Sequence, residues 1–410
     1  MIDLNILRKE PEKIVNLIKK KDPSYDVNGL IELDKQVRKL NLEIEALRSK
    51  KNELAKLASS GITVELREES IQVSKELKNK EGEFEKIEKD FKKLYLFCPN
   101  IIQDDVPQGN KESNVVVKVV GKKPEFNFTI KKHLELIQNL GWVDFQAASK
   151  MAGSRFVLYK NDAVKLIYSL TMLMLKNNIK HGFEPILPPY LVNGESLEVA
   201  GNFPKFQEEV YSVKDDNLYL IPTSEVSLTN IYKDHIFVKS DLPIRMTSWT
   251  SCFRREAGTY GSAEQGLIRI HQFEKVELYT ICSPEKSQEE QDRMLACAED
   301  ILNQLGLHYR VSLLAAQDTS FQSAKTYDIE VWLPGQNAYY EVSSCSNCTD
   351  FQSRRGAIRF KDNDSKNNQL VHTLNCSSLA LPRLIVALVE TYQKEDGAIQ
   401  FPEVLKNFII

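Results

Sequence analysis

The stretch Ser248–Tyr279, SWTSCFRREAGTYGSAEQGLIRIHQFEKVELY, most constrains what this chain can fold into. It predicts a strand over Ser248–Glu256, a polar loop over Ala257–Gly266 and a second strand that runs through Glu277. Successive side chains of a strand point to opposite faces. One face of the hairpin therefore carries Thr250, Cys252, Arg254, Glu256, Arg269, His271, Phe273, Lys275 and Glu277. Such a face suits a planar base and a phosphate, and it equally suits a solvated sheet face with surface ion pairs.

The length and composition of the chain set the broad class. A chain of 410 residues is too long for one ordinary core, so two domains are expected. The formal net charge of −3 excludes a generally basic nucleic-acid binder, and any RNA contact must use local patches. The seven cysteines are scattered and suggest a reducing compartment rather than a disulfide framework. Without a hydrophobic signal core or a run of about 18 apolar residues, a cytoplasmic protein that does not enter a membrane is expected.

The N-terminal part predicts an antiparallel two-helix coiled coil over about residues 27–97, within a domain of residues 1–98. Apolar residues alternate at spacings of four and three in two stretches, on either side of the turn Ser59–Gly61. The stretches contain Leu33, Val37, Leu40, Ile44, Leu47 and Leu54, and then Val73, Leu77, Phe84, Ile87, Phe91 and Leu94. Residues 1–20 predict one short amphipathic helix. Basic and acidic residues crowd the outer positions, which fits either a solvated surface or a rod that follows an RNA backbone.

The rest of the chain predicts an α+β domain with an antiparallel sheet. Residues 99–126 are rich in Pro, Asn, Asp and Gly and mark a linker, and the domain extends over residues 127–410. Helices are expected over His133–Leu140, Ala163–Ile179 and 284–305, and strands over Leu218–Ile221, Tyr309–Leu313, Tyr327–Trp332, Ala338–Val342 and Val371–Leu374. Neither GxGxxG after a strand nor GxxxxGK[ST] is present, so ATP would not bind through those motifs.

From about Gly153 to Phe401 the chain resembles seryl-tRNA synthetases almost continuously, and the predicted coiled coil fits the same family. The matching segments are motif 1 (His181–Val192), a TxE triplet (Thr223–Glu225), motif 2 (Cys252–Glu277), two strands before motif 3 (Thr326–Trp332 and Glu341–Cys348) and motif 3 (Asn375–Arg383). Single short motifs mislead, but this number of them in the family's order is specific.

The resemblance implies a class II aminoacyl-tRNA synthetase that acts as a serine–tRNA ligase. Such an enzyme activates L-serine with ATP and Mg²⁺ and then transfers serine to the 3′ end of tRNA(Ser), with tRNA(Sec) as a second candidate acceptor. It also implies a homodimer through motif 1, around Pro189, in which the coiled coil of one subunit binds the long variable arm of a tRNA on the other.

The resemblance also assigns the site residues. Arg254 and Arg383 are expected to be catalytic: the guanidinium fork of Arg254 matches the α-phosphate, and Arg383 would pack on the other side of the ATP. ATP would be bound by Arg254, Arg255, Glu256, Phe273, Glu341, Val342, Ser343, Ser344 and Arg383, with Mg²⁺ on Glu341 and Ser344. Serine would be bound by Thr223, Ser224, Glu225, Glu277 and Ser377. Glu277 would accept the hydroxyl of the substrate, so that a substrate without one leaves it unpaired.

The chain departs from the family in motif 3. Cys376, Ser378 and Pro382 replace glycines, and the side chains at 376 and 378 would be expected to crowd the nucleotide. Cys345 and Cys348 invite a zinc interpretation, but a closed site needs four ligands and Cys376 adds only one, so no zinc is expected. Two other functions stay open: amino-acid activation for a carrier protein, against which the arm argues, and a catalytically inactive coiled-coil interaction protein, which only the lost glycines favour.

Overall fold

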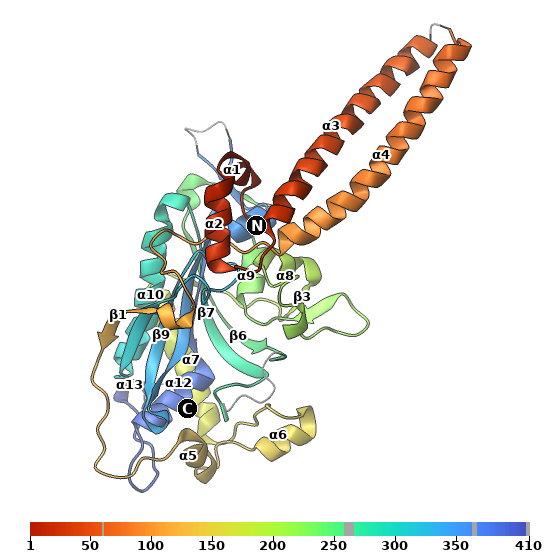
Figure 1. The fold of residues 1–410 in the computed structure, drawn as a ribbon. Coiled ribbons are helices and arrows are strands. Elements are labelled where there is room, and N and C mark those ends of the chain that lie inside the picture. The colour runs from red at the N-terminus through yellow and green to blue at the C-terminus, as the bar shows by residue number, and fades with distance from the viewer. Residues whose placement is uncertain (60, 258–265, 363–366, 407–410) are drawn as a thin grey trace. The chain divides into compact units, whose positions relative to one another are not determined.

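The computed structural model describes residues 1–59, 61–257, 266–362 and 367–406 (Figure 1). Contacts divide the chain into two compact units, one of Met1 and Asp3–Pro99 and one of Ile2 and Asn100–Ile410. Ser60, the middle of the predicted turn, and most of the predicted loop Ala257–Gly266 lie outside the described residues. In the described part of the chain, no helix combines the length and the apolar character needed to cross a membrane.

The first unit is helical. It contains α1 (Leu4–Lys9), α2 (Pro11–Lys21) and the two long helices α3 (Val27–Ala58) and α4 (Val64–Leu96). The single helix predicted for residues 1–20 is wrong. Pro11 lacks a backbone N–H and cannot continue α1, so it occupies the first turn of a new helix.

The two long helices pack along their predicted apolar positions. Leu40, Ile44 and Leu54 of α3 and Val73 and Leu77 of α4 are buried, as heptad spacing requires. Three ion pairs cross between the helices at the surface, namely Arg48–Glu81 (2.7 Å), Lys50–Glu69 (2.7 Å) and Lys80–Glu43 (2.8 Å). The helical hairpin expected from the sequence is therefore present.

Within the described residues, the second unit is built on an eight-stranded sheet in the order β1-β8-β9-β10-β13-β7-β6-β2 (Figure 1). Its neighbours are antiparallel except β2 and β6, which confirms the predicted α+β fold with an antiparallel sheet. The strands are β1 (Val115–Val120), β2 (Glu184–Pro185), β6 (Ile244–Phe253), β7 (Gln272–Cys282), β8 (Tyr309–Leu313), β9 (Lys325–Leu333), β10 (Ala338–Thr349) and β13 (His372–Ala380).

Helices α7 (Asp162–Lys180), α10 (Ser287–Gln304) and α12 (Leu381–Thr391) pack their apolar faces against one side of this sheet. Val276 and Leu278 of β7 belong to that core, whereas Lys275 and Glu277 alternate with them. Charged side chains of β7 therefore project from the opposite side, where the candidate site lies.

The remaining elements are short. The helices are α5 (His133–Asn139), α6 (Phe145–Ala152), α8 (Gly194–Ala200), α9 (Glu225–Asn230), α11 (Phe351–Arg355) and α13 (Glu403–Lys406). Two small sheets contain β3 (Leu191–Asn193) with β4 (Leu218–Leu220), and β5 (Ile236–Val238) with β11 (Arg359–Lys361) and β12 (Gln369–Leu370). Single 3₁₀ turns occur at Lys111–Ser113, Gln207–Glu209, Lys239–Asp241, Pro284–Lys286 and Pro334–Gln336.

The central hairpin is shorter than predicted. The strand expected over Ser248–Glu256 ends at Phe253, and its partner begins only at Gln272. The ladder ends because the Arg255 N–H donates to the Glu209 carbonyl (2.9 Å) instead of the facing strand. Glu256 then adopts a left-handed backbone conformation with φ of 51°. Arg269 and His271 also precede the strand on which they were placed.

Candidate active site

Two adjoining cavities open among the predicted residues. The first, here called the Phe273 cavity, is lined by Leu267, Ile268, Ile270, Phe273, Ala380, Pro382 and Arg383 together with shared residues. The second, the Glu277 cavity, has a volume of about 500 Å³, and its walls include Thr223, Glu225, Glu277, Ser344 and Asn375. Both walls contain Arg254, Glu256, Arg269, Lys275, Glu341 and Ser377. Because the cavities share these residues, they form one continuous site.

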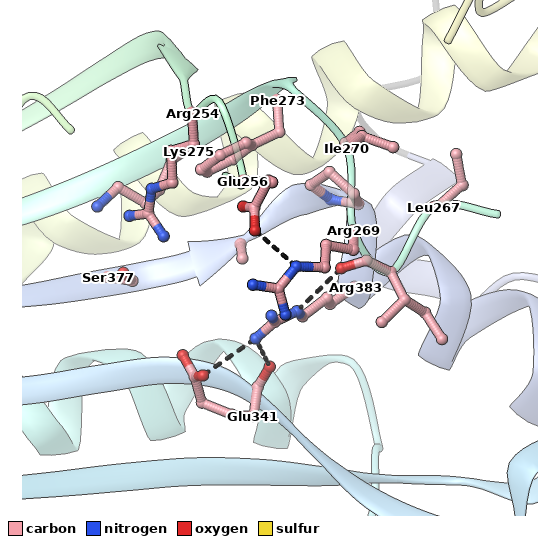
Figure 2. A pocket seen from close by; sticks show the side chains of 13 residues that line it. Arg254, Glu256, Leu267, Arg269, Ile270, Phe273, Lys275, Glu341, Ser377 and Arg383 are labelled. Carbon is pink, nitrogen blue, oxygen red and sulfur yellow. Dashed lines mark hydrogen bonds and ion pairs between the residues drawn. The ribbon is translucent and has the colours of Figure 1, made fainter. Parts of the chain in front are cut away.

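Three arginines surround the Phe273 cavity, and each is held by a carboxylate, a carbonyl or an aromatic ring (Figure 2). The Arg254 guanidinium lies 5.2 Å from the centroid of the Phe273 ring, and its Nε donates to the Pro222 carbonyl (3.2 Å). Arg269 Nε donates to Glu256 Oε2 at 2.5 Å. The ends of β6 and β7 thus place two guanidinium groups and a ring at one opening.

Arg383 reaches the same cavity from α12. Its Nη1 donates to the Glu341 carbonyl (2.8 Å) and to Glu341 Oε2 (3.0 Å), and its Nε donates to the Ile268 carbonyl (3.4 Å) (Figure 2). These contacts fix the plane of the guanidinium. Pro382 lies in the first turn of α12, where a missing N–H costs little, and it lines the cavity beside Arg383.

The Glu277 cavity contains a buried triad. Thr223 Oγ1 donates to Glu277 Oε2 (3.0 Å), Lys275 Nζ donates to Thr223 Oγ1 (2.9 Å), and Lys275 also forms an ion pair with Glu277. Only 6% of Lys275 and 1% of Glu277 are exposed. Buried charges need such partners, because taking either charge from water alone would be strongly unfavourable.

Glu225 forms the other acidic wall of the Glu277 cavity. Its Oε1 accepts hydrogen bonds from Gln352 Nε2 (2.6 Å) and Asn375 Nδ2 (3.0 Å). Burial, followed by the nearby Glu277 carboxylate, raises the pKa of Glu225 to about 7, and Lys275 opposes this shift. A carboxylate in this setting favours a cationic ligand, because an ammonium group would stabilise its charged form.

A β-bulge brings Glu341 and Ser344 to the same cavity although they are three residues apart on one strand. The register between β10 and β9 shifts between Glu341 and Ser343, which restores Ser344 to the side of Glu341. Ser344 Oγ donates to Asp328 Oδ1 (2.7 Å). Burial and then the Glu341 charge raise the pKa of Asp328 well above its ordinary value. Glu341 and Ser344 thus place hard oxygen atoms at the cavity wall, and Asp328 binds Ser344 without lining either cavity.

Four predicted site residues lie outside the cavity walls. The Ser224 side chain is buried, the Val342 side chain belongs to the hydrophobic core, and Arg255 is exposed to solvent. Ser343 is also buried, and its Oγ donates to the Ser377 carbonyl (2.5 Å). Any contact of Val342 with a ligand would therefore come through its backbone.

The side chains that replace glycine at positions 376 and 378 do not crowd the site, contrary to the expectation from the sequence. Cys376 is fully buried in the core opposite Cys345, and Ser378 Oγ donates to Asn178 Oδ1 of α7 (2.9 Å). Between them, Ser377 faces both cavities. The alternation of β13 turns both new side chains to the helical side of the sheet. Among the described residues, no three His, Cys, Asp or Glu side chains gather as a metal site.

Two residues of the site, Lys275 and Gln352, were not predicted from the sequence to bind the substrate or to support a binding residue. Lys275 was placed on the correct face from alternation, but its pairing with Glu277 and Thr223 depends on a segment far away in sequence. Gln352 follows the strand before motif 3, and nothing in its local sequence signals a contact with Glu225.

Comparisons with known proteins agree with this geometry. The family model of the seryl-tRNA synthetase N-terminal domain matches residues 1–102, and that of the tRNA synthetase class II core domain (G, H, P, S and T) matches residues 209–392. The chain is 43% identical to the serine–tRNA ligase of Desulfotalea psychrophila over 100% of this chain and 99% of the relative. It is 46% identical to that of Hydrogenobaculum sp., again over 100% and 99%.

A solved structure agrees as well. The crystal structure of seryl-tRNA synthetase from Pyrococcus horikoshii complexed with ATP is similar with a TM-score of 0.93 and 34% identity, covering 100% of this chain and 98% of that one. The similarity includes both the helical arm and the sheet, so the chain belongs to the seryl-tRNA synthetase family of class II aminoacyl-tRNA synthetases.

Proposed function

We propose that this protein is a serine–tRNA ligase that forms seryl-adenylate from L-serine and ATP and then transfers serine to the 3′ end of tRNA(Ser). The observation that carries this proposal is the buried triad of Thr223, Lys275 and Glu277 beside Glu225, in a cavity continuous with one that holds three arginines and a phenylalanine. The triad suits a small zwitterion with a hydroxyl, and the ring and arginines of the Phe273 cavity suit the base and phosphates of a nucleotide.

Serine is recognised by its two polar ends. Glu225 accepts from the ammonium group, and Glu277 accepts from the hydroxyl, with Thr223 and Ser377 lining the pocket. Thr223 donates to Glu277 Oε2, so alanine and glycine are rejected because they leave Glu277 Oε1 without a hydroxyl donor. Ser224 contributes through the backbone at the start of α9, since its buried side chain does not line the cavity.

Activation is attack of the serine carboxylate oxygen on the α-phosphorus of ATP, with pyrophosphate leaving. The nucleophile belongs to the substrate, so the protein supplies position and charge stabilisation. Arg254 binds the α-phosphate, Phe273 and Arg383 bind the adenine from two sides, and Glu256 accepts from its amine. Arg255, Val342 and Ser343 contribute less directly, because their side chains lie outside the cavities.

Glu341 and Ser344 would hold Mg²⁺ on the phosphates, and the gathered oxygen atoms fit that hard cation. When bound, Mg²⁺ neutralises charge on the phosphate oxygens. Two direct protein ligands suffice, because Mg²⁺ usually keeps substrate phosphates and waters in its coordination shell.

The arm and motif 1 account for tRNA binding and assembly. Residues 1–98 bind the long variable arm of tRNA(Ser) with exposed lysines and arginines, and tRNA(Sec) is a second candidate acceptor. Exposed Leu187 beside β2, with Tyr168 and Met172 four residues apart on α7, supports a homodimer around Pro189. The seven cysteines are free thiols, which supports a reducing cytoplasmic location.

The test is serine-dependent ATP–pyrophosphate exchange without tRNA, with alanine, glycine and threonine as controls. Exchange with serine alone, followed by charging of a long-armed tRNA, is the expected result. A folded protein that shows no exchange overturns the proposal. Exchange with another amino acid keeps the reaction but overturns the assignment of Glu277.

A further inference from the structure

Gln352 of α11 lies at the centre of a buried polar network behind Glu225. Its Nε2 donates to Glu225 Oε1 (2.6 Å) and to the Ala200 carbonyl (2.9 Å). Its Oε1 accepts from Tyr279 Oη (3.1 Å) and Thr373 Oγ1 (2.6 Å). The side chain is fully buried and does not line either cavity. It therefore acts on a ligand only through another residue.

The network fixes which end of the amide faces Glu225. A side-chain amide has two N–H donors and one carbonyl oxygen with two acceptor positions, and all four are used here. The hydroxyls of Tyr279 and Thr373 both donate to the carbonyl oxygen. The Ala200 carbonyl and the Glu225 carboxylate can only accept hydrogen bonds, so the N–H group of the amide must point to them.

The same contacts divide the two oxygens of the Glu225 carboxylate. Gln352 and Asn375 both donate to Oε1, so Oε2 is the oxygen left for the cavity. We infer that Gln352 is a positioning residue for serine: it orients the Glu225 carboxylate so that Oε2 accepts from the substrate ammonium. This inference rests on the proposed function, because it assigns Glu225 to the amino group of serine.

Gln352 also affects the charge of Glu225. The charged groups that face this carboxylate are Glu277 and Lys275 of β7 and Arg254 after β6. Gln352 donates to the ionised form and so opposes the rise in pKa caused by burial. Loss of this donor would favour protonation of Glu225, and binding of serine would then weaken at a higher pH than in the unaltered protein.

The experiment compares Gln352→Leu with Gln291→Leu in the exchange assay. Gln291 of α10 is a matched control, because it is also fully buried and donates to two backbone carbonyls, Lys325 (3.1 Å) and Cys345 (3.2 Å), away from the cavities. Gln352→Leu is expected to raise KM for serine roughly 10- to 100-fold, since a hydrogen bond to a charged group contributes about 1.5–3 kcal/mol. KM for ATP should stay within about twofold of the unaltered value.

The pH profile separates positioning from packing. In Gln352→Leu the pH at which KM for serine begins to rise should move upward, whereas Gln291→Leu should keep the unaltered profile. Equal changes in the two variants, or an unaltered profile in Gln352→Leu, overturn the inference. If the unaltered protein itself shows no serine-dependent exchange, the proposed function fails instead.

Two milder variants keep the test decisive if Gln352→Leu does not fold. Thr373→Val and Tyr279→Phe each remove one hydroxyl that binds the Gln352 amide oxygen and leave Gln352 in place. Each should raise KM for serine by a few-fold and move the pH profile in the same direction. Tyr309→Phe is their control, because the Tyr309 hydroxyl donates to Glu299 (3.0 Å) outside the cavities. An effect of Tyr309→Phe equal to that of Tyr279→Phe contradicts the inference.

Discussion

The two adjoining cavities use similar numbers of charged side chains but satisfy them in different ways. In the Glu277 cavity, Lys275 and Glu277 are buried and pair with each other, and the neutral Thr223 hydroxyl contacts both. In the Phe273 cavity, Arg383 pairs with the half-exposed Glu341 and with backbone carbonyls, so the guanidinium stays accessible.

This difference indicates how one site can bind two substrates that need different kinds of recognition. A buried carboxylate with one oxygen left for the ligand discriminates strongly, because a wrong ligand leaves that oxygen unsatisfied. The more exposed side chains of the Phe273 cavity, such as Arg383, discriminate weakly but can stabilise the large charge of a triphosphate. Selectivity is therefore expected to depend on β7 and rate on the arginines at the ends of the strands.

The largest effect should come from breaking the buried triad with Glu277→Gln. Loss of one partner of a buried, hydrogen-bonded charge pair at a binding site costs about 2–5 kcal/mol of binding, which corresponds to a fall of roughly 30- to 5,000-fold in kcat/KM for serine. Exchange kinetics at varied serine concentration measure this. Glu274→Gln is the matched control on the same strand, because Glu274 bonds Trp249 Nε1 (2.6 Å) on the opposite face. Equal losses in both variants would contradict the special role of Glu277.

A smaller effect is expected in the other cavity from Arg254→Lys. Lysine keeps the charge but loses the fork that binds phosphate at two points, so kcat should fall roughly 10- to 100-fold while KM for serine changes little. Arg255→Lys serves as the neighbouring control, since Arg255 lies outside the cavity walls. If the two variants lose kcat equally, the exclusion of Arg255 from the site is wrong.

A pH titration sharpens the comparison without any mutation. Because the pKa of Glu225 is raised to about 7, KM for serine should increase as pH falls through about 7. KM for ATP should not follow this titration. A flat serine profile would contradict an ionised Glu225 in binding.

Stability should change in the opposite direction to serine binding as pH rises. Between about pH 4.5 and 7 the folded protein keeps a proton on Glu225 that the unfolded chain releases, so the free energy of unfolding should fall as pH rises through this range.

The sequence predicted the architecture well, because its signals are local or periodic. Heptad spacing located the two arm helices, and alternation placed Phe273, Lys275 and Glu277 on one face of β7. Alternation failed where the strands end. Arg254, Glu256 and Arg269 reach the cavity from irregular backbone. The φ of 51° at Glu256 could not be predicted, because a glutamate within an alternating pattern is expected to be extended.

The missed features depend on contacts between distant segments. The bulge that brings Ser344 to the side of Glu341 arises from pairing with β9, and strict alternation would have put Ser343 there instead. Gln352 meets Glu225 across 127 residues of chain. Such contacts follow from tertiary packing, so a single sequence carries no local pattern for them.

The smallest effect on activity should come from restoring glycine at the two buried positions of motif 3. The Cys376 and Ser378 side chains lie in the core and against α7, so Cys376→Gly and Ser378→Gly should leave KM for ATP within about twofold. Each should lower the free energy of unfolding by roughly 1–2 kcal/mol, through lost contacts and the conformational freedom of glycine in a strand. Ser377→Gly is the contrasting variant, because Ser377 faces both cavities, and it should raise KM for serine. A gain in ATP affinity on restoring either glycine would mean that these side chains reach the nucleotide, and the separation between the two faces of β13 would then be incorrect.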